Sequence, residues 1–419
     1  MKAPYSYKKI ASYEGEIGKI GTVLLLYSGG LDTSVILKWI KDEYKVDVVT
    51  LTLDIGQQKD DLEAIKKKAL KLGAKEAIVL DAQKEFAEEY IAKGIKANAS
   101  YQGEYHLSTP IGRAITAKRG VEIAKQKGIS CIAHGCTGKG NDQVRFEGYI
   151  LAHDATMKVL APVREWNMDR NEEIAYAKKH GIEVPVKKDF PYSDDDNMWG
   201  MTWEGGEIEN PASVPNVEKF LTTYTLPEKA TNIPETLTLE FKNGIPIKLN
   251  GKKETLMDLI AHLNKLGGKH GVGIAYMIED RIVGLKDRGV YEQPAAHCII
   301  EAHKALERYV STRELNELKS VLDIKWGYLC YGAKWFEPTM NALNAFNDEV
   351  NQKVEGVVTL KLYKGTVTVV ALTSPYGLSH TSFNNTEGYH FNVNASAGFT
   401  EIYSLQMKIA NDIARKNKK

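Results

Sequence analysis

A seven-residue loop after a short apolar run has the residue types of an anion site. The run is Val23–Tyr27, and the loop reads Ser28-Gly29-Gly30-Leu31-Asp32-Thr33-Ser34. Glycine lets the main chain approach a ligand closely. A helix that starts in this loop would point unpaired N–H groups and the positive end of its dipole at that ligand. The hydroxyls of Ser28, Thr33 and Ser34 can add further donors, so the stretch predicts an anion-binding helix start.

Two other phosphate-binding motifs do not fit this sequence. A Walker A loop needs a Gly-Lys pair followed by Ser or Thr, but Gly138-Lys139 is followed by Gly140 and has Ala133 in place of the first glycine. The three spaced glycines of a dinucleotide-binding turn do not follow the first apolar run. The remaining alternative is an ordinary glycine turn in which a short polar side chain caps a helix.

A second glycine-rich loop follows another apolar run, Ile129–Ala133. It reads Gly135-Cys136-Thr137-Gly138-Lys139-Gly140-Asn141-Asp142. Because open α/β sheets bind ligands beyond the carboxyl ends of their strands, we expect both loops to face one crevice. Cys131, His134 and Cys136 lie close together, but their spacing is not a common structural zinc pattern. The sequence therefore favours no metal at that cluster.

Strand and helix alternate over the part of the chain that carries these loops. Strands are expected at 23–27, 46–53, 77–80 and 129–133, and helices at 32–44, 62–72, 84–96 and 113–127. The near-continuous apolar residues of 46–53 are typical of a parallel strand that is buried on both faces. The alternation predicts the α/β class, with a doubly wound parallel sheet forming a nucleotide-binding domain over 1–186.

The pattern then changes to an α+β domain, expected over 187–376, in which 191–197 reads as a polar, turn-rich loop. Hairpins are expected around Asn243-Gly244 and Lys364-Gly365. Helices are expected at 254–266, 297–309, 312–328 and 341–352, with a capping box at Ser311 and Glu314 in front of the third of them. The last part, 377–419, reads as a linker and an amphipathic helix at 399–416, which either packs on another subunit or folds back on its own domain.

The length and amino-acid composition are those of an ordinary globular protein. The chain of 419 residues carries a net charge of +1, 43% hydrophobic and 26% charged residues. This balance provides no global field for nucleic acid or an acidic membrane surface. The segment Met1–Lys19 lacks the apolar core of a signal peptide, and no apolar run reaches the ~20 residues of a membrane span. Four cysteines suggest a reducing compartment. We expect a cytoplasmic protein without nucleic-acid or membrane partners.

Five segments in register resemble the argininosuccinate synthase family, within the ATP pyrophosphatase superfamily. The first loop matches the pyrophosphate-binding loop of that superfamily. The five segments are Ser28–Ser34, Tyr105–Arg113, His134–Glu147, Lys269–Gly273 and Glu279–Glu292. The resemblance runs from about Lys19 to the C-terminal helix and implies an adenine nucleotide α-hydrolase-like domain followed by a synthetase domain.

This resemblance implies a ligase of arginine biosynthesis and the urea cycle that uses ATP with Mg²⁺. The ureido oxygen of citrulline attacks the α-phosphate of ATP, which gives citrullyl-AMP and pyrophosphate. The amine of aspartate then displaces AMP to form argininosuccinate. Adenylation turns a poor leaving group into a good one, so the protein mainly positions the reactants and stabilises charge. The family also implies a homotetramer built through the second domain and the C-terminal helix.

The resemblance also assigns substrate contacts to residues of this chain. ATP contacts fall on Leu26, Tyr27, Ser28, Gly29, Gly30, Leu31, Asp32, Thr33, Ser34, Leu53, Gly135 and Thr137. Aspartate contacts fall on Thr137, Asn141 and Asp142, and citrulline contacts on Tyr105, Asn141, Arg145, Ser193, Thr202, Glu279 and Tyr291. Asp32, Asp142 and Arg145 are the catalytic candidates. Arginine suits a carboxylate because its guanidinium binds it with two parallel hydrogen bonds.

Three positions depart from part of the family. Pro110 stands where many members carry a serine that binds citrulline, and Thr202 replaces a serine while keeping its hydroxyl. Leu53-Asp54 stands where many members carry Ala-Asn near the adenine, and the larger Leu53 could pack on the base. The alternative function is another adenylating enzyme with the same loop, such as a ligase that modifies a tRNA base. Its basic RNA-facing surface would disagree with a net charge of +1.

Overall fold

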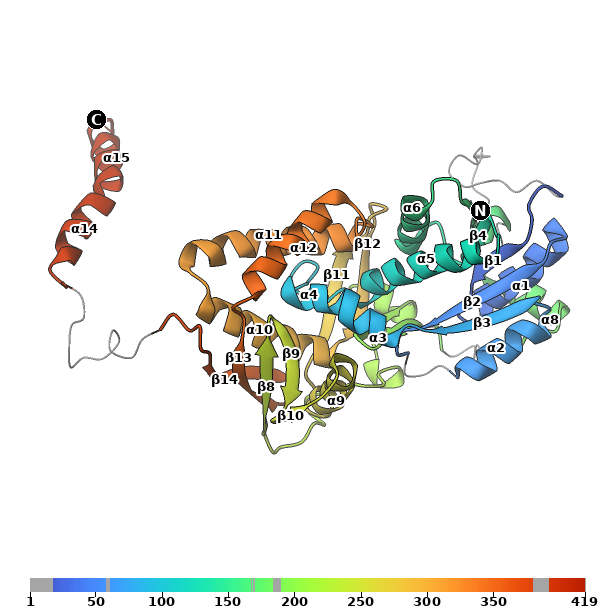
Figure 1. Ribbon diagram of the computed structural model, residues 1–419, viewed down its shortest axis with the longest axis horizontal. Coiled ribbons are helices and arrows are strands. Elements are labelled where there is room, and N and C mark those ends of the chain that lie inside the picture. Colours follow the sequence, from blue (N-terminus) through green and yellow to red (C-terminus); the bar gives the residue numbers. More distant parts are fainter. Residues whose placement is uncertain are drawn as a thin grey trace.

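The computed structural model describes residues 18–57, 61–166, 168, 170–183, 190–379 and 392–418. In Figure 1 the N-terminal part forms one end of the main body, and the later sheets and helices form the other. The predicted boundary between 186 and 187 lies outside the described residues, as do residues 1–17 of the segment compared with a signal peptide. Among the described residues, no helix is long and apolar enough to cross a membrane.

A five-stranded parallel sheet forms the centre of the N-terminal part, as the α/β prediction requires. Its strands are β1 (Val23–Leu26), β2 (Val48–Asp54), β3 (Glu76–Asp81), β4 (Cys131–Ala133) and β5 (Lys158–Leu160), in the order β3-β2-β1-β4-β5. Successive strands run outward from β1 to β3, and the chain then crosses to β4 on the other side of β1. The point where strand order reverses, between β1 and β4, is where such sheets bind ligands.

Helices cover both faces of this sheet, which confirms the doubly wound prediction. Val23 and Leu25 of β1 point into one apolar cluster, which includes α1 (Leu31–Tyr44) and α2 (Leu62–Lys71). Leu24 and Leu26 point into the other cluster. Adjacent residues of a strand face opposite sides. The second cluster includes α5 (Ser108–Gln126), and further helices of this part are α6 (Asp142–His153), α7 (Pro162–Trp166) and α8 (Arg170–Lys179).

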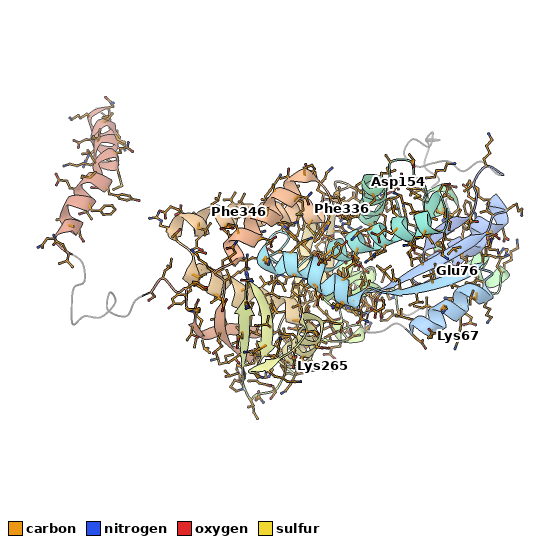
Figure 2. The ribbon with its side chains drawn as sticks, viewed as in Figure 1. Lys67, Glu76, Asp154, Lys265, Phe336 and Phe346 are labelled. Carbon is orange, nitrogen blue, oxygen red and sulfur yellow. The ribbon has the colours of Figure 1, made fainter. Side chains whose placement is uncertain are left out.

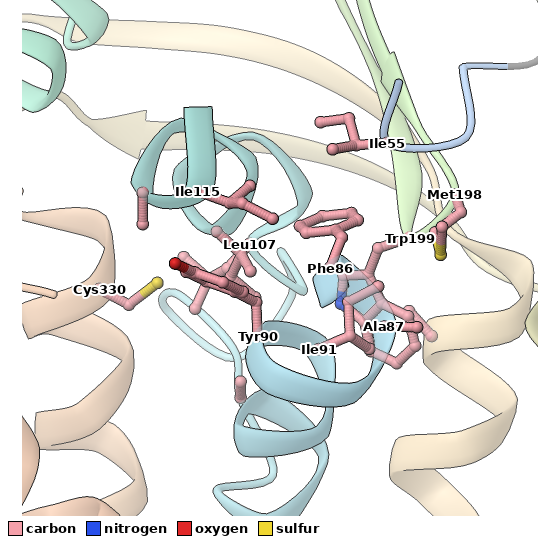
Figure 3. Close-up of a cluster of buried hydrophobic side chains, with 14 of the residues drawn as sticks. Ile55, Phe86, Ala87, Tyr90, Ile91, Leu107, Ile115, Met198, Trp199 and Cys330 are labelled. Carbon is pink, nitrogen blue, oxygen red and sulfur yellow. The ribbon is translucent and has the colours of Figure 1, made fainter. Parts of the chain in front are cut away.

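The helix predicted at 84–96 contains a wider turn in its middle. It consists of α3 (Gln83–Glu85), the π-helical η1 (Phe86–Ile91) and α4 (Ala92–Lys96). Four η1 side chains, Phe86, Ala87, Tyr90 and Ile91, are buried. Figure 3 shows them facing Leu107 and Ile115 of the N-terminal part, and Trp199 and Cys330 of the later part. One apolar cluster therefore joins the two parts, and the π turn, a rare single-turn insertion in a helix, lies within it.

The later part contains two antiparallel sheets. One has the order β11 (Ile274–Asp280), β12 (Lys286–Glu292), β7 (Gly200–Glu204) and β6 (Ser193–Asn197). The other has the order β10 (Lys252–Lys253), β9 (Ile245–Leu249), β8 (Glu235–Lys242), β13 (Gly356–Tyr363) and β14 (Thr366–Thr373). Both predicted hairpins are confirmed. The loop predicted at 191–197 is wrong, because β6 pairs with β7 there; as an edge strand it can expose polar side chains such as Ser193 and Asp194.

The four helices predicted for the later part are present, with ends that lie up to three residues from the predicted ones. They are α9 (Leu256–Lys269), α10 (Pro294–Val310), α11 (Arg313–Tyr331) and α12 (Pro338–Asn351), and this part also contains the short η2 (Gly206–Glu209) and η3 (Val217–Lys219). Thr312 caps α11, accepting from the Leu315 N–H at 3.4 Å, so the predicted cap at Ser311 is wrong by one residue. The reason is that Ser311 terminates α10 in an extended conformation.

The helix predicted at 399–416 is two helices, α14 (Ala395–Tyr403) and α15 (Leu405–Lys416). They meet at Ser404, whose hydroxyl donates to the Thr400 carbonyl at 2.7 Å, and such bonds to the preceding turn bend helices. None of the residues described in α14 and α15 is buried. Figure 1 shows this pair standing away from the main body.

Candidate active site

The two glycine loops touch each other beyond the carboxyl ends of β1 and β4. These strands are neighbours in the sheet, with Val23 opposite Cys131. A Cβ added to Gly135 in the second loop would lie 3.1 Å from Thr33 Cγ2 in the first loop and 3.1 Å from Ile36 Cδ1. A glycine at 135 therefore lets the loops meet closely. The two loops are therefore neighbours, and the crevice above them stays a prediction.

The first loop has the backbone of an anion cradle. Gly29 has φ +79°, and a Cβ there would lie 2.7 Å from Ile65 Cγ1, so both conformation and space favour glycine. Gly30 precedes α1 in an extended conformation, and no side chain caps the helix start. The ammonium of Lys68 on α2 donates to the Gly29 carbonyl at 2.7 Å. Lys68 is half-buried beside the loop, and this burial lowers the pKa of its ammonium group.

The hydroxyl groups of this loop form hydrogen bonds with neighbouring hydroxyls and with the main chain of the loop. Ser28 Oγ and Thr33 Oγ1 lie 3.2 Å apart across the loop. The Ser34 hydroxyl is fully buried and donates to the Gly30 carbonyl at 2.6 Å, and the Tyr27 hydroxyl lies 3.0 Å from Ser34 Oγ. Ser28 is the more accessible hydroxyl, whereas Ser34 braces the turn from beneath.

Asp142, the first residue of α6, lies between two arginines. Arg113 Nε donates to its Oδ2 at 2.9 Å, and Arg145 Nη1 donates to its Oδ1 at 2.8 Å. Asp195 of β6 accepts from Arg113 Nη2 at 2.6 Å. Burial alone would raise the pKa of Asp142, but the two guanidinium groups outweigh it and hold that pKa at about 2. Asp142 is therefore ionised at neutral pH.

Arg145 and Asn141 are oriented by the end of α11. The carbonyl of Tyr331 accepts from Arg145 Nε at 3.2 Å and from Nη2 at 3.0 Å. The Tyr331 hydroxyl accepts from Asn141 Nδ2 at 2.8 Å, and Asn141 Oδ1 accepts from the Ile282 N–H at 2.7 Å. Arg145 is 4% exposed, and its guanidinium also lies 4.9 Å from the centre of the Tyr331 ring. Both side chains are thus fixed before any ligand arrives.

The predicted citrulline residues Tyr105, Thr202, Glu279 and Tyr291 lie together. Tyr291 on β12 is in register with Thr202 on β7, and its hydroxyl donates to Glu279 Oε2 at 3.1 Å. The rings of Tyr105 and Tyr291 have centroids 4.3 Å apart. Burial raises the pKa of Glu279, and the charge of Arg145 opposes that rise. The cluster therefore lies next to Arg145, which belongs to the helix that follows the second loop.

Other predicted residues lie at the rim or below the surface. Ser193 is exposed at the end of β6, opposite Glu204. Thr137 is exposed in the second loop, whereas Leu53 is buried in the apolar core at the end of β2. Pro110 occupies the first turn of α5, where its missing N–H would have had no intrahelical partner.

An acidic group beside the cluster is paired with an arginine. Carboxylate oxygens of Glu204, Glu279 and Asp287 lie within 4.8 Å of one another, close enough to hold a cation. Arg281 Nη2 lies 2.9 Å from Glu204 and also pairs with Asp287. Burial raises the pKa of Glu204 to about 7. A fixed guanidinium therefore already neutralises much of this charge.

Three residues contribute to the site without a predicted role. Arg113 lies in the Tyr105–Arg113 segment, and the sequence marks it only as an arginine in a predicted helix. Gly289 makes room for Tyr291, since a Cβ there would lie 2.7 Å from the Tyr291 hydroxyl. Tyr331 ends an otherwise ordinary amphipathic helix, and no local pattern marks it. The cluster at Cys131, His134 and Cys136 instead places His134 Nε2 3.2 Å from Glu147 Oε1.

Comparison with known proteins covers nearly the whole chain. The family profile described as Arginosuccinate synthase N-terminal HUP domain matches residues 22–183, and Arginosuccinate synthase C-terminal domain matches 192–410. A protein named Argininosuccinate synthase from Pyrococcus furiosus is 47% identical over 93% of this chain and 94% of its own length. Proteins of that name from Picrophilus torridus and Symbiobacterium thermophilum are 46% and 45% identical, covering 94% and 92% of this chain and 98% and 96% of their own lengths.

Proposed function

Because this chain belongs to the argininosuccinate synthase family, we propose that its two glycine loops and the adjoining strand ends form the active site. The chain is an ATP-dependent ligase of arginine biosynthesis. It joins citrulline to aspartate through citrullyl-AMP and releases pyrophosphate and AMP. The residue roles below are the proposal. The observation that supports it is the close approach of Gly135 to Thr33, beyond neighbouring strands at the point where the strand order reverses.

The first loop is proposed to hold the phosphates of ATP. The uncapped start of α1 presents main-chain N–H groups, which stabilise the negative charge of departing pyrophosphate. Ser28 and Thr33 are the hydroxyls placed to add donors, and Ser34 keeps the loop in shape. Lys68 adds positive charge next to the cradle. Asp32 at the first turn is assigned to orienting the loop or the Mg²⁺ that enters with ATP, and Leu26, Leu53 and Gly135 border the nucleoside.

The second loop and the strand cluster are proposed to hold the two amino acids. Asp142 is ionised and suits the ammonium group of aspartate, with Asn141 and Thr137 beside it. Arg145 suits a substrate carboxylate. Glu279 and Tyr291 suit the ammonium end of citrulline, and Tyr105, Thr202 and Ser193 complete that pocket. Held in this way, the ureido oxygen and the aspartate amine meet the reacting atoms without paying the entropy of a free encounter.

We further propose a cytoplasmic homotetramer. The apolar side chains Phe399, Ile402, Ile409 and Ile413 of α14 and α15 are all at least half exposed. An amphipathic helix gains stability by burying its apolar face, so this pair suits a contact with another subunit. Sedimentation of the full chain against a chain ending at residue 379 tests the assignment. The same number of chains per particle in the two would contradict it.

A partial-reaction assay tests the active-site proposal. Purified protein should release pyrophosphate from MgATP only when citrulline is present, and form argininosuccinate when aspartate is added. Arg145→Ala should abolish most of that activity while leaving the unfolding transition in place. Pyrophosphate release that depended on tRNA would favour the base-modifying alternative, and a fully active Arg145→Ala variant would refute the site.

A further inference from the structure

We infer that Tyr331 is a positioning residue through which the later part of the chain sets the geometry of both amino-acid subsites. This inference rests on the proposed roles of Asn141, Arg145 and Glu279. Tyr331 is the last residue of α11 and is 3% exposed. None of the five segments that resemble the family includes Tyr331.

The main chain of Tyr331 holds Arg145. Its carbonyl is one of the last four of α11, which have no partner within the helix. That carbonyl accepts two hydrogen bonds from the Arg145 guanidinium, at 3.2 and 3.0 Å. The negative end of the helix dipole favours a cation at this position. Because Arg145 Nη1 is also held by Asp142, the guanidinium has one allowed orientation.

The side chain of Tyr331 links the two subsites. Its hydroxyl accepts from Asn141 Nδ2 at 2.8 Å, and it lies close enough to the Glu279 carboxyl for Tyr331 to lower the pKa of that carboxyl. Glu279 in turn accepts from the Tyr291 hydroxyl at 3.1 Å. Tyr331 therefore stands between the proposed aspartate residue Asn141 and the proposed citrulline residues Glu279 and Tyr291.

Packing fixes the position of Tyr331 itself. Its ring stacks on Tyr101 with a centroid distance of 3.6 Å and an angle of 3°. Tyr101 pairs with Tyr105 through the main chain, at 2.7 Å from its N–H to the Tyr105 carbonyl. The turn after α11 also holds Phe336, labelled in Figure 2, edge-on to Tyr149 of α6 at 5.2 Å. The end of α11 thus contacts the segments that carry Tyr105 and Arg145.

Tyr331→Phe tests this role because it removes the hydroxyl but keeps the ring stack and the carbonyl. Loss of the hydroxyl that accepts from Asn141 and lies beside the Glu279 carboxyl predicts a fall of about 10- to 100-fold in kcat/KM for citrulline. The ionised form of Glu279 also loses a donor, so its pKa should rise. The acid limb of the pH profile of kcat/KM for citrulline should therefore move to higher pH.

Tyr328→Phe is the matched control. Tyr328 lies one turn earlier on α11, packs edge-on against the same Tyr101 ring at 5.0 Å, and is 47% exposed. It should keep the wild-type kcat/KM and pH profile. A Tyr331→Phe variant with the kinetics of Tyr328→Phe would overturn the inference. So would one that only lowers the urea midpoint and kcat while its acid limb stays fixed, because that is the result of a purely structural role.

Arg145→Ala, measured alongside, separates this inference from the proposed active site. If Arg145→Ala is inactive and Tyr331→Phe is normal, only the role of Tyr331 is refuted. If Arg145→Ala leaves the kinetics of both amino acids unchanged, the substrate assignment itself fails.

Discussion

Asp142→Asn is the sharpest test of the electrostatics at the second loop. The substitution keeps the shape of the side chain and one acceptor oxygen, but removes the charge between Arg113 and Arg145. Those guanidinium groups lie 2.9 and 2.8 Å from its two carboxylate oxygens. The new amide N–H₂ must face one of them, so at least one charge-assisted hydrogen bond is lost. Such a bond contributes about 1.5–3 kcal/mol.

The expected kinetic loss follows from that free energy. If the proposed ammonium contact of aspartate depends on the same charge, about 1.5–3 kcal/mol of transition-state stabilisation is removed, or about 10- to 150-fold in kcat/KM for aspartate. Initial rates of argininosuccinate formation, with aspartate varied at saturating citrulline and MgATP, measure it. Because both arginines outweigh the effect of burial and hold the pKa of Asp142 at about 2, wild-type activity should not titrate with this group above pH 4.

Asp195→Asn provides the comparison. Asp195 pairs with the same Arg113, at 2.6 Å, but lies outside the proposed substrate contacts. Its loss should affect kcat/KM for aspartate less than Asp142→Asn does. The reasoning is refuted if Asp142→Asn stays within about threefold of wild type, or if the two variants lose activity equally.

Three further predictions concern the first loop and the core. Gly29→Ala forces a Cβ to 2.7 Å from Ile65 Cγ1 at φ +79°, so KM for ATP should rise and the urea midpoint should fall by the equivalent of about 1–3 kcal/mol; unchanged values would contradict the cradle. Lys319 is 2% exposed and pairs with both Glu307 and Asp323, so Lys319→Met leaves two carboxylates without their cation, and urea unfolding should show a loss of about 3–5 kcal/mol. Burial lowers the pKa of His106 to about 3, below the 6.5 of an exposed histidine, so the folded protein favours the neutral imidazole. Its contribution to stability should be lost as pH falls below about 6.5, and an NMR titration of its ring above pH 6 would exclude this.

Local features that need only a few neighbouring residues could be predicted from the sequence. The glycine loop at 28–34 and the hairpin turn at Asn243-Gly244 are examples, because glycine and asparagine permit backbone angles that other residues disfavour. The alternation of strands and helices predicted the parallel sheet, and with it the neighbouring positions of the two loops, since the carboxyl ends of parallel strands meet at one edge.

Features that depend on distant partners could not be predicted in this way. The edge strand Ser193–Asn197 is polar and forms because β7 offers it hydrogen bonds. The π turn at Phe86–Ile91 forms where apolar side chains of both parts of the chain converge. The orientation of Arg145 depends on a carbonyl 186 residues later. Residue types and loop chemistry are properties of the chain itself, whereas hydrogen-bond partners, burial and the resulting pKa values exist only once packing removes water from between distant segments.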